Sequence, residues 1–202
     1  MGAWPAVGYQ RPTWPPAVCH DDQGQVIPYG NRWAGSPPDD AYSRVTNQQR
    51  FAPLLTVTAA LIEHLRAEYQ VTSSITGSVT ELDPGPAAAR LRFAVDPDTF
   101  VVRLTAGPVA QFGYPVCACD ACDETAEAMA DDLEATVFAV VAGHLRQRVG
   151  PPPRGKGRTG LVIEVGGAHA SSSWTLLDRA ERRRIRDLLR GAPERWEPWT
   201  RR

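Results

Sequence analysis

The sequence predicts an α+β fold in which a mostly antiparallel sheet of three to five strands is packed by helices. Two stretches with apolar residues at helical spacing enclose a series of short segments with alternating apolar residues. Strands and helices do not alternate regularly, which argues against a doubly wound parallel sheet. The expected order is therefore an N-terminal arm followed by α-βββ(β)-α-β-α.

The first expected helix spans about residues 47–69. It follows a capping-box pattern, in which Thr46 precedes Gln49 by three positions. Pro53 is expected to kink or restart this helix, because proline removes a backbone donor and is tolerated only in the first turn. The apolar stripe consists of Phe51, Leu54, Leu55, Thr58, Leu61, Ile62, Leu65 and Tyr69.

Three segments with alternating apolar residues follow and are expected to form strands. These segments are 71–79, 91–95 and 100–104. Proline- and aspartate-rich stretches at 83–86 and 96–98 supply turns between them, so the strands should form an antiparallel meander. Residues 109–116 are expected to add a short edge strand that ends at Pro115.

A second helix is expected at about residues 124–148, and the glycine and prolines at 150–153 should end it. A basic, glycine-rich link at 154–160 then leads to a short apolar strand at 161–165. The buried stripe of the helix is predicted to contain Met129, Leu133, Val137, Val140, Val141 and His144.

A last helix is expected to begin at the capping box of Asp178 and Glu181 and to end near Leu189. Trp196 and Trp199 should then pin the C-terminal tail to the body. Over the whole chain, the residues predicted to be in the core are Leu61, Leu65, Phe93, Val102, Leu133, Val137, Val140 and Ile185.

Residues 1–45 are expected to form a proline- and tryptophan-rich arm, and residues 46–202 a single α+β domain. The arm has few periodic apolar positions. Its three tryptophans, Trp4, Trp14 and Trp33, favour docking onto the body, since large apolar side chains are seldom left isolated on a surface. The alternative is a disordered proline-rich ligand segment.

Charge and hydropathy exclude several classes of protein. The net charge of −1 argues against a general binder of polyanions. No apolar run approaches the roughly 18–20 residues that a membrane helix needs, and the N-terminus does not resemble a signal peptide. The sequence therefore predicts a soluble cytoplasmic protein, whose thiols would stay reduced.

Residues 117–124 read Cys-Ala-Cys-Asp-Ala-Cys-Asp-Glu and contain three of the four cysteines in the chain. A Cys-x-Cys-x-x-Cys pattern can present three thiolates to one Zn²⁺ from a single loop. Cys117, Cys119 and Cys122 are therefore candidate zinc ligands. This pattern holds only one CxxC unit, whereas two such units would be a stronger indication of zinc.

A tetrahedral zinc site would need a fourth ligand from elsewhere in the chain. The arm offers Cys19 and His20, and His20 is taken as the fourth candidate ligand, because a bond there would tether the arm to the body. His144, His169 and Asp120 are further candidates.

The same cysteines allow two other interpretations. Cys119 and Cys122 form a CxxC unit just before a predicted helix, whose dipole would favour a reactive thiolate. Carboxylates at Asp120, Asp123 and Glu124 would raise the thiol pKa values and oppose this effect. The remaining interpretation is structural, with reduced thiols packing a tight loop. Metal binding, redox chemistry and packing all remain open from the sequence.

Several stretches carry a resemblance to a known family. They are Tyr42-Ser43-Arg44-Val45-Thr46, Arg50-Phe51-Ala52-Pro53-Leu54, the motif Pro-x-Cys-x-Cys-Asp-x-Cys-Asp-Glu at 115–124, residues 137–143, and the ending with Trp196 and Trp199. With them the chain resembles an uncharacterised actinobacterial protein family, catalogued as a domain of unknown function, over roughly residues 40–202. The resemblance implies membership in that family and no particular activity.

The charges are unevenly distributed. Seven acidic residues and no lysine or arginine lie between Arg103 and Arg146, whereas nine arginines and five acidic residues lie in 178–202. We expect the last helix to place its arginines near Glu127, Asp131 or Glu134. The alternative is a basic face that binds an acidic protein or nucleic acid.

These features predict a bacterial protein that is a non-catalytic accessory or interaction module with a structural zinc site. A protein partner is conceivable, and neither nucleic acid nor a membrane is expected as a partner. The alternative is an enzyme that uses the same cysteines as a thiol redox centre or as an open metal site. No histidine, lysine or second acid lies close enough in sequence to act as a partner base, which argues against the enzyme.

Overall fold

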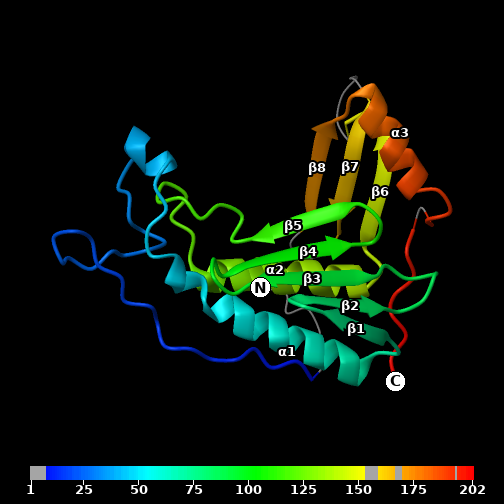
Figure 1. Cartoon of the computed structure of the whole chain (residues 1–202), viewed down its shortest axis with the longest axis horizontal. Helices are drawn as coiled ribbons and strands as arrows, with labels where there is room; N and C mark the ends of the chain where they lie inside the picture. Colours follow the sequence, from blue (N-terminus) through cyan, green and yellow to red (C-terminus); the bar gives the residue numbers. More distant parts are fainter. Residues whose placement is uncertain (1–7, 153–158, 167–169, 194) are drawn as a thin grey trace.

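The computed structural model describes residues 8–152, 159–166, 170–193 and 195–202 (Figure 1). Within these residues it contains three α-helices and two antiparallel sheets, one of five and one of three strands, in the order α-βββββ-α-βββ-α. The predicted α+β class and antiparallel pairing are confirmed. Trp4 and most of the basic link at 154–160 lie outside the described residues.

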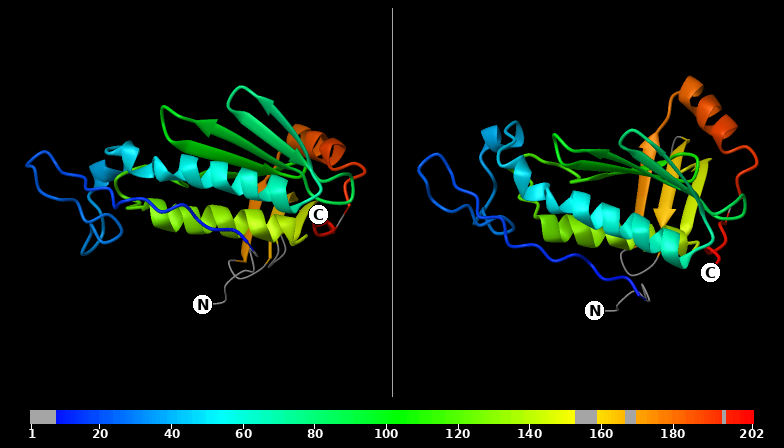
Figure 2. Two further views of the ribbon diagram at one scale, coloured as in Figure 1. Left: turned by 90° about the horizontal axis from the view of Figure 1, so that it is seen from below. Right: turned by 60° about the horizontal axis from the view of Figure 1, so that its bottom comes forward.

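The larger sheet is a simple meander, in which each strand pairs with the next one along the chain. It consists of β1 (Thr72–Thr76), β2 (Val79–Asp83), β3 (Leu91–Asp96), β4 (Val101–Ala106) and β5 (Ala110–Tyr114). Its two helices, α1 (Pro53–Glu68) and α2 (Ala126–Val141), lie side by side on one face of this sheet (Figure 2). The other face of the sheet carries exposed polar side chains such as Arg92 and Arg103.

The core fills the space between the sheet and these two helices. Leu91 and Phe93 are fully buried while Arg92 between them is exposed, as the two-residue period of a strand requires. Phe93 is paired with Leu104 across β3 and β4, which places two large side chains on the helix-facing side. Seven predicted core residues are buried: Leu61, Leu65, Phe93, Val102, Leu133, Val137 and Val140.

The smaller sheet consists of β6 (Leu145–Gly150), β7 (Gly160–Val165) and β8 (Ser171–Leu176). Its strands run crosswise to those of the larger sheet, and α3 (Arg179–Leu188) packs against β6 and β7 (Figure 1). The predicted capping box is present, because Asp178 and Glu181 each accept the other's backbone N–H. Ile185 is only half-buried on α3, so its assignment to the core was wrong.

Three predicted elements differ from the structure. The single strand expected at 71–79 is a hairpin, in which Gly77 adopts a φ of +58° in the turn between β1 and β2. The second helix ends at Val141 instead of reaching 148, and the chain reverses at Gly143 into β6. β8 was not expected, because its serine-rich sequence has little apolar alternation.

The start of α1 also differs from the capping-box prediction. A short 3-10 helix at Gln48–Phe51 precedes α1, and Pro53 begins the α-helix as a first-turn proline. Neither N-cap position makes a side-chain capping bond. The Thr46 hydroxyl donates to Asp120 instead, in the loop that holds the cysteines.

The arm runs along α2 before it turns away and returns to the body. Tyr9 and Arg11 both bond the carboxylate of Glu134, and Arg11 also pairs with Asp131 at 2.5 Å. Trp14 donates from its indole nitrogen to Glu127 at 3.1 Å. These contacts place the arm on the acidic residues that the last helix was expected to meet.

The C-terminal tail is fixed by Trp199, which is 4% exposed and donates from Nε1 to Ala89 at 2.8 Å. Its backbone N–H bonds the carbonyl of Val141, at the end of α2. Close by, the backbone of Trp196 crosses Gly143 so tightly that a Cβ at Gly143 would lie 2.7 Å from the Trp196 carbonyl oxygen. The tail therefore stabilises the chain reversal between α2 and β6.

Candidate metal centre

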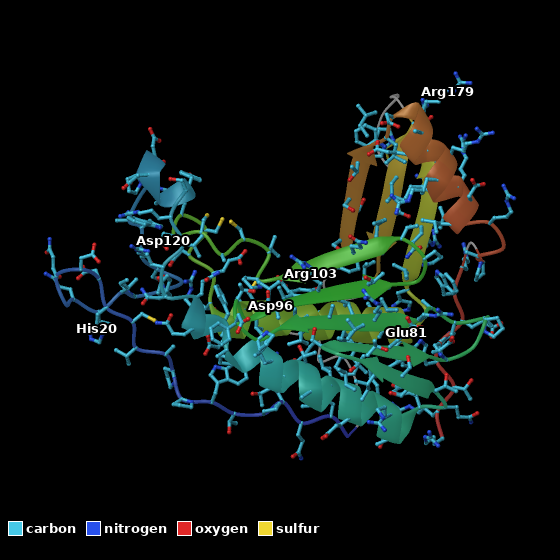
Figure 3. All side chains as sticks on the ribbon, in the orientation of Figure 1. His20, Glu81, Asp96, Arg103, Asp120 and Arg179 are labelled. Carbon is cyan, nitrogen blue, oxygen red and sulfur yellow. The ribbon has the colours of Figure 1, made fainter. Side chains whose placement is uncertain are left out.

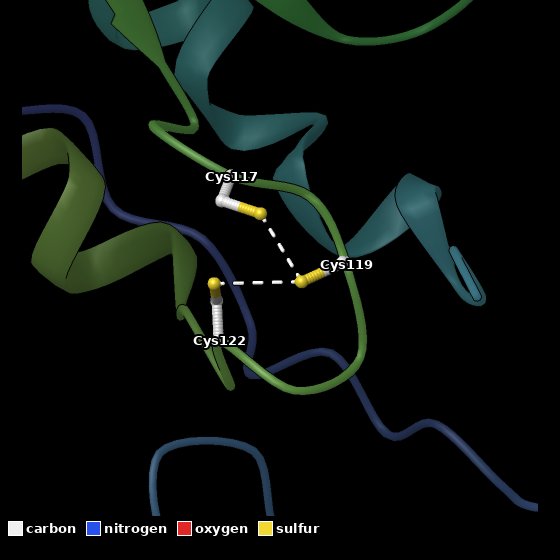
Figure 4. Close-up of side chains that lie close together, drawn as sticks. All are labelled: Cys117, Cys119 and Cys122. Carbon is white, nitrogen blue, oxygen red and sulfur yellow. Dashed lines mark hydrogen bonds between the residues drawn. The ribbon is translucent and has the colours of Figure 1, made fainter. Parts of the chain in front are cut away.

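The loop between β5 and α2 brings three cysteine side chains together (Figure 4). The Sγ atoms of Cys117 and Cys119 are 3.1 Å apart, and those of Cys119 and Cys122 are 3.4 Å apart. All three sulfurs lie within 4.8 Å of one another. Sequence spacing alone therefore identified a set of soft ligands that do converge on one point.

The three thiols differ in their access to solvent. Cys119 is buried, Cys117 is half-buried, and Cys122 is exposed. An ion held between them would be enclosed by protein on one side and reachable from solvent on the other. This arrangement suits uptake of a metal from solution more readily than a fully enclosed site would.

Hydrogen bonds among the three thiols shift the pKa values of Cys119 and Cys122 in opposite directions. Contacts with the Cys117 thiol, then with the Cys122 thiol and the N–H groups of Cys122 and Ala121, lower the pKa of Cys119 against the opposing effect of burial. Hydrogen bonds with Cys117 and Cys119 raise the pKa of Cys122 to about 12. One thiolate is thus favoured, while three neighbouring thiolates would require a cation to offset their repulsion.

Asp120 and Asp123 of the motif bond residues of the arm and of the segment where the arm joins the body. Asp120 is 1% exposed, and its Oδ1 accepts hydrogen bonds from both N and Oγ1 of Thr46. Its Oδ2 lies 3.6 Å from the guanidinium of Arg32. Asp123 accepts the backbone N–H of Arg32 at 2.8 Å. Asp120 and Asp123 therefore hold the arm and the start of the body against the loop.

Glu124 is the acidic residue that does bond the cysteine segment. Its carboxylate accepts the backbone N–H of Cys117 at 3.1 Å, which closes the loop on itself. Burial raises the pKa of Glu124, although hydrogen bonds from the backbone of Cys117 and Val116 oppose that shift. Glu124 therefore holds the shape of the loop that positions the sulfurs.

Arg50 links the loop to the body, a role that the sequence does not indicate. It is 3% exposed and donates to the carbonyl oxygens of Thr46, Ala118 and Glu124. Its guanidinium also lies 4.2 Å from the ring centre of Tyr29. No local pattern around Arg50 distinguishes it from a surface arginine, because its partners are distant in sequence.

Backbone contacts complete the junction between the arm and the cysteine loop. The N–H of Asp120 bonds Arg44, and the N–H of Ala121 bonds Ala41. Trp33 donates from Nε1 to the Asp120 carbonyl at 3.2 Å and packs beside Cys119. The far side of the loop is therefore covered by residues of the arm.

The structure places the other predicted ligands outside the group of three. His20 is exposed on the distal loop of the arm, where its backbone pairs with Val26 (Figure 3). Cys19 is buried beside it, and Asp120 is bonded to Thr46. His144 lies at the start of the smaller sheet. His169 lies outside the described residues, and among the described ones no fourth ligand joins the sulfurs.

The fold and the site define an α+β protein with a three-cysteine loop that could hold a metal ion. The chain belongs to the family of unknown function DUF6226, which matches residues 15–202. This match confirms membership in a family of unknown function, and it also includes the part of the arm that carries Cys19 and His20. Comparisons with curated proteins and with solved structures gave no match.

None of the helices in the described part of the chain has the length and apolar character needed to cross a membrane. The longest, α1 and α2, have 16 residues each, and both are packed on the larger sheet.

Proposed function

We propose that the protein is a non-catalytic accessory or interaction module in which Cys117, Cys119 and Cys122 bind one Zn²⁺. The metal would fix the loop around which the arm is wrapped, and so hold the arm and the body in one arrangement. The convergence of three sulfurs within 4.8 Å is the observation that carries this proposal.

The sulfur positions fit the dimensions of a zinc site. A tetrahedral ion with bonds of about 2.3 Å separates its sulfur ligands by about 3.8 Å. The sulfur–sulfur separations of 3.1 and 3.4 Å in the loop are slightly shorter, so the thiols would move apart by a few tenths of an ångström on binding. Such a change needs only side-chain rotation within a loop that is already formed.

His20 lies outside the group of three in this structure, so it would be the fourth ligand only if the distal loop of the arm moved to the cysteines. A bond from His20 would join the arm to the loop that other arm residues already contact, such as Trp33. A water molecule or a donor from a partner protein would fill the same position if His20 does not, because the exposed Cys122 leaves that side of the site open to solvent.

The surroundings of the cluster support a structural role. Among the described residues that contact the loop, Asp120, Arg50 and Glu124 are all engaged in holding backbone or side chains in place. None of them is left in position to act as a general base beside a sulfur-bound substrate. The polar groups of the loop are therefore used in internal hydrogen bonds, as expected for a structural site.

A second candidate function is thiol exchange, which the lowered pKa of Cys119 favours. The Cys119 thiolate would attack a disulfide of a substrate and form a mixed disulfide, releasing one substrate thiol. The exposed Cys122 would then attack Sγ of Cys119 and release the second substrate thiol. The protein would end with a Cys119–Cys122 disulfide and the substrate with two thiols.

Metal analysis of the native protein separates these two functions. Protein purified without a metal-affinity step should contain close to one equivalent of zinc, and Cys119→Ser should contain almost none. Cys19→Ser is the matched control, because Cys19 is also buried but lies outside the cluster, and it should keep the metal. Metal-free protein that is quantitatively oxidised by a small disulfide would support thiol exchange instead.

A further inference from the structure

The two parts of the chain carry opposite charge. Residues 142–202 contain 14 of the 22 lysines and arginines but only 6 of the 23 acidic residues, which gives this segment a net charge of +8. Residues 1–141 have a net charge of −9. The overall charge of −1 therefore conceals a strongly basic C-terminal segment that forms the smaller sheet, α3 and the tail.

Helix α3 concentrates this positive charge on one side. Arg179, Arg183 and Arg186 recur at intervals of four and three residues, so they lie along one face of α3 for about 11 Å. Arg190 follows in the turn after Leu189, the C-cap of the helix. The half-buried Ile185 lies on a different side of the helix, as expected for packing against β6 and β7. We call the four arginines the arginine stripe.

The stripe is almost free of acidic partners. Within the described residues its one ion pair is that of Arg190 with Asp187, and both of those side chains are more than half exposed. Arg179, Arg183 and Arg186 have no hydrogen bond or ion pair to any described residue, and Arg179 extends away from the body (Figure 3). The side chains are therefore available to an external anion.

The expected internal partners are occupied by other residues. Glu134 and Asp131 are bound by Arg11, and Glu127 by Trp14, all on the side of α2 along which the arm runs. The prediction that the arginines of α3 lie against these acids was wrong. Like charges on one helix face also repel one another, so the stripe reduces the stability of the isolated helix.

We propose that the arginine stripe binds the phosphate backbone of a nucleic acid. Arginine presents a planar fork of donors that matches phosphate oxygens. Backbone binding needs only such cations, because it proceeds by release of the counterions that surround the phosphates. This proposal replaces the expectation that nucleic acid is not a partner.

An acidic protein fits the stripe less well. The centre of a protein interface is depleted in charge and depends on buried apolar or aromatic anchors. The arginine stripe contains none, since Ile185 and Leu189 are half-buried on another side of α3. A membrane surface is disfavoured because Ile185 and Leu189 are half-buried, and the exposed Leu188 lies on the side of the helix opposite the arginine stripe.

The test is fluorescence anisotropy with the full chain and labelled 20-nucleotide RNA or 20-base-pair DNA of random sequence. We expect saturable binding at low salt that weakens steeply as KCl is raised. Four neutralised phosphates predict a slope of about −3.6 for duplex DNA in a plot of log K against log[KCl]. No saturable binding at about 50 mM salt to either probe would overturn the proposal.

The variant Arg179→Ala/Arg183→Ala/Arg186→Ala should bind at least tenfold more weakly, and the magnitude of its salt slope on duplex DNA should be smaller by about 2.7. Alanine has the highest helix propensity, so α3 should remain folded, which circular dichroism would check. The matched control is Arg66→Ala/Arg92→Ala/Arg103→Ala, which removes three exposed arginines from α1 and the larger sheet. It should leave binding unchanged.

Two outcomes would contradict the assignment. Equal weakening in both triple variants would mean that general charge, and not the stripe, attracts the nucleic acid. Polyglutamate can be added as a competitor in place of unlabelled nucleic acid. If it displaces the labelled probe at the same or a lower concentration of charged groups, an acidic protein would fit this face at least as well as a nucleic acid.

Discussion

Asp120 and Thr46 lie 74 positions apart in the sequence, yet Oδ1 of Asp120 accepts hydrogen bonds from both N and Oγ1 of Thr46, at 2.9 and 2.8 Å. Asp120 lies inside the CxxC unit, and Thr46 lies where the arm enters the body. The same contact therefore fixes the path of the arm and the shape of the loop that gathers the cysteines. Zinc bound to that loop would act on the arm through this pair.

Replacement of Asp120 tests this connection. Asp120→Ala should lower the free energy of unfolding by about 3 kcal/mol, because it leaves the Thr46 donors and the mostly buried Arg32 without a partner. Asp120→Asn should cost less, since its amide oxygen can still accept from Thr46. Asp40→Ala breaks an exposed pair with Arg44 and should cost less than about 1 kcal/mol. Urea unfolding measures all three, and equal effects of the two alanine variants would refute the role of Asp120.

The core between α2 and the larger sheet gives a second prediction. Leu133 is fully buried, so Leu133→Ala should cost about 2–5 kcal/mol, depending on how far the cavity can relax. Ile185 is half-buried on α3, and Ile185→Ala should cost clearly less. A loss below about 1 kcal/mol for Leu133→Ala would show that α2 does not pack through this side chain.

His64 gives the protein a specific response to acid. Its imidazole packs against Tyr9 and Phe138, and its Nε2 is buried without a hydrogen-bond partner among the described residues. Desolvation lowers the pKa of His64 below 6.5, while the nearby Glu68 opposes the shift and Arg201 adds to it. His64 is therefore protonated at a higher pH in the unfolded chain than in the folded chain. The free energy of unfolding should consequently fall as the pH drops below 6.5.

Nuclear magnetic resonance titration of His64 should give a pKa below 6.5. The loss of stability between pH 7.5 and 5.5 should also be smaller in His64→Gln than in the native chain, since the other titrating groups are common to both proteins. An equal loss in the two proteins would mean that His64 titrates normally in the fold.

The sequence was sufficient for the local features and insufficient where distant segments decide the structure. Alternating apolar residues identified β3 and β4, and the capping box identified the start of α3. The extent of the second helix was wrong because His144 follows Val140 by four residues, a spacing that fits a helix, although His144 comes after the end of α2 and just before β6. What ends α2 is the positive φ of Gly143 and the close backbone of Trp196.

The candidate site shows the same division. The spacing of Cys117, Cys119 and Cys122 predicted that they form one group of ligands, because three cysteines within six residues can lie on a single loop. The contributions of Arg50 and Arg32 were invisible, because each acts on the loop from a segment about 70 or more residues away. The capping-box pattern predicted that Thr46 caps the first helix, whereas its hydroxyl donates a hydrogen bond to Asp120.

Metal removal should loosen the arm as well as the loop. The amides of Asp120 and Ala121 bond Arg44 and Ala41, so chelation of zinc should speed their hydrogen exchange together with that of Thr46. Amides in the middle of α1 should not change. In Cys119→Ser, which lacks the metal, chelator should have no further effect. If the amides of Asp120, Ala121 and Thr46 exchange at unchanged rates after verified loss of zinc, the metal does not stabilise the contact between the arm and the loop.

X-ray absorption at the zinc edge is the decisive test of the three-cysteine metal site, because it counts the sulfur ligands of the bound ion. Zinc in the native protein should have three sulfur atoms at about 2.3 Å and one nitrogen or oxygen atom at about 2.0 Å. His20→Ala should keep the three sulfurs and lose any imidazole signature. A native protein without zinc, or with zinc bound by two or fewer sulfurs, would contradict the assignment of Cys117, Cys119 and Cys122 as a metal centre.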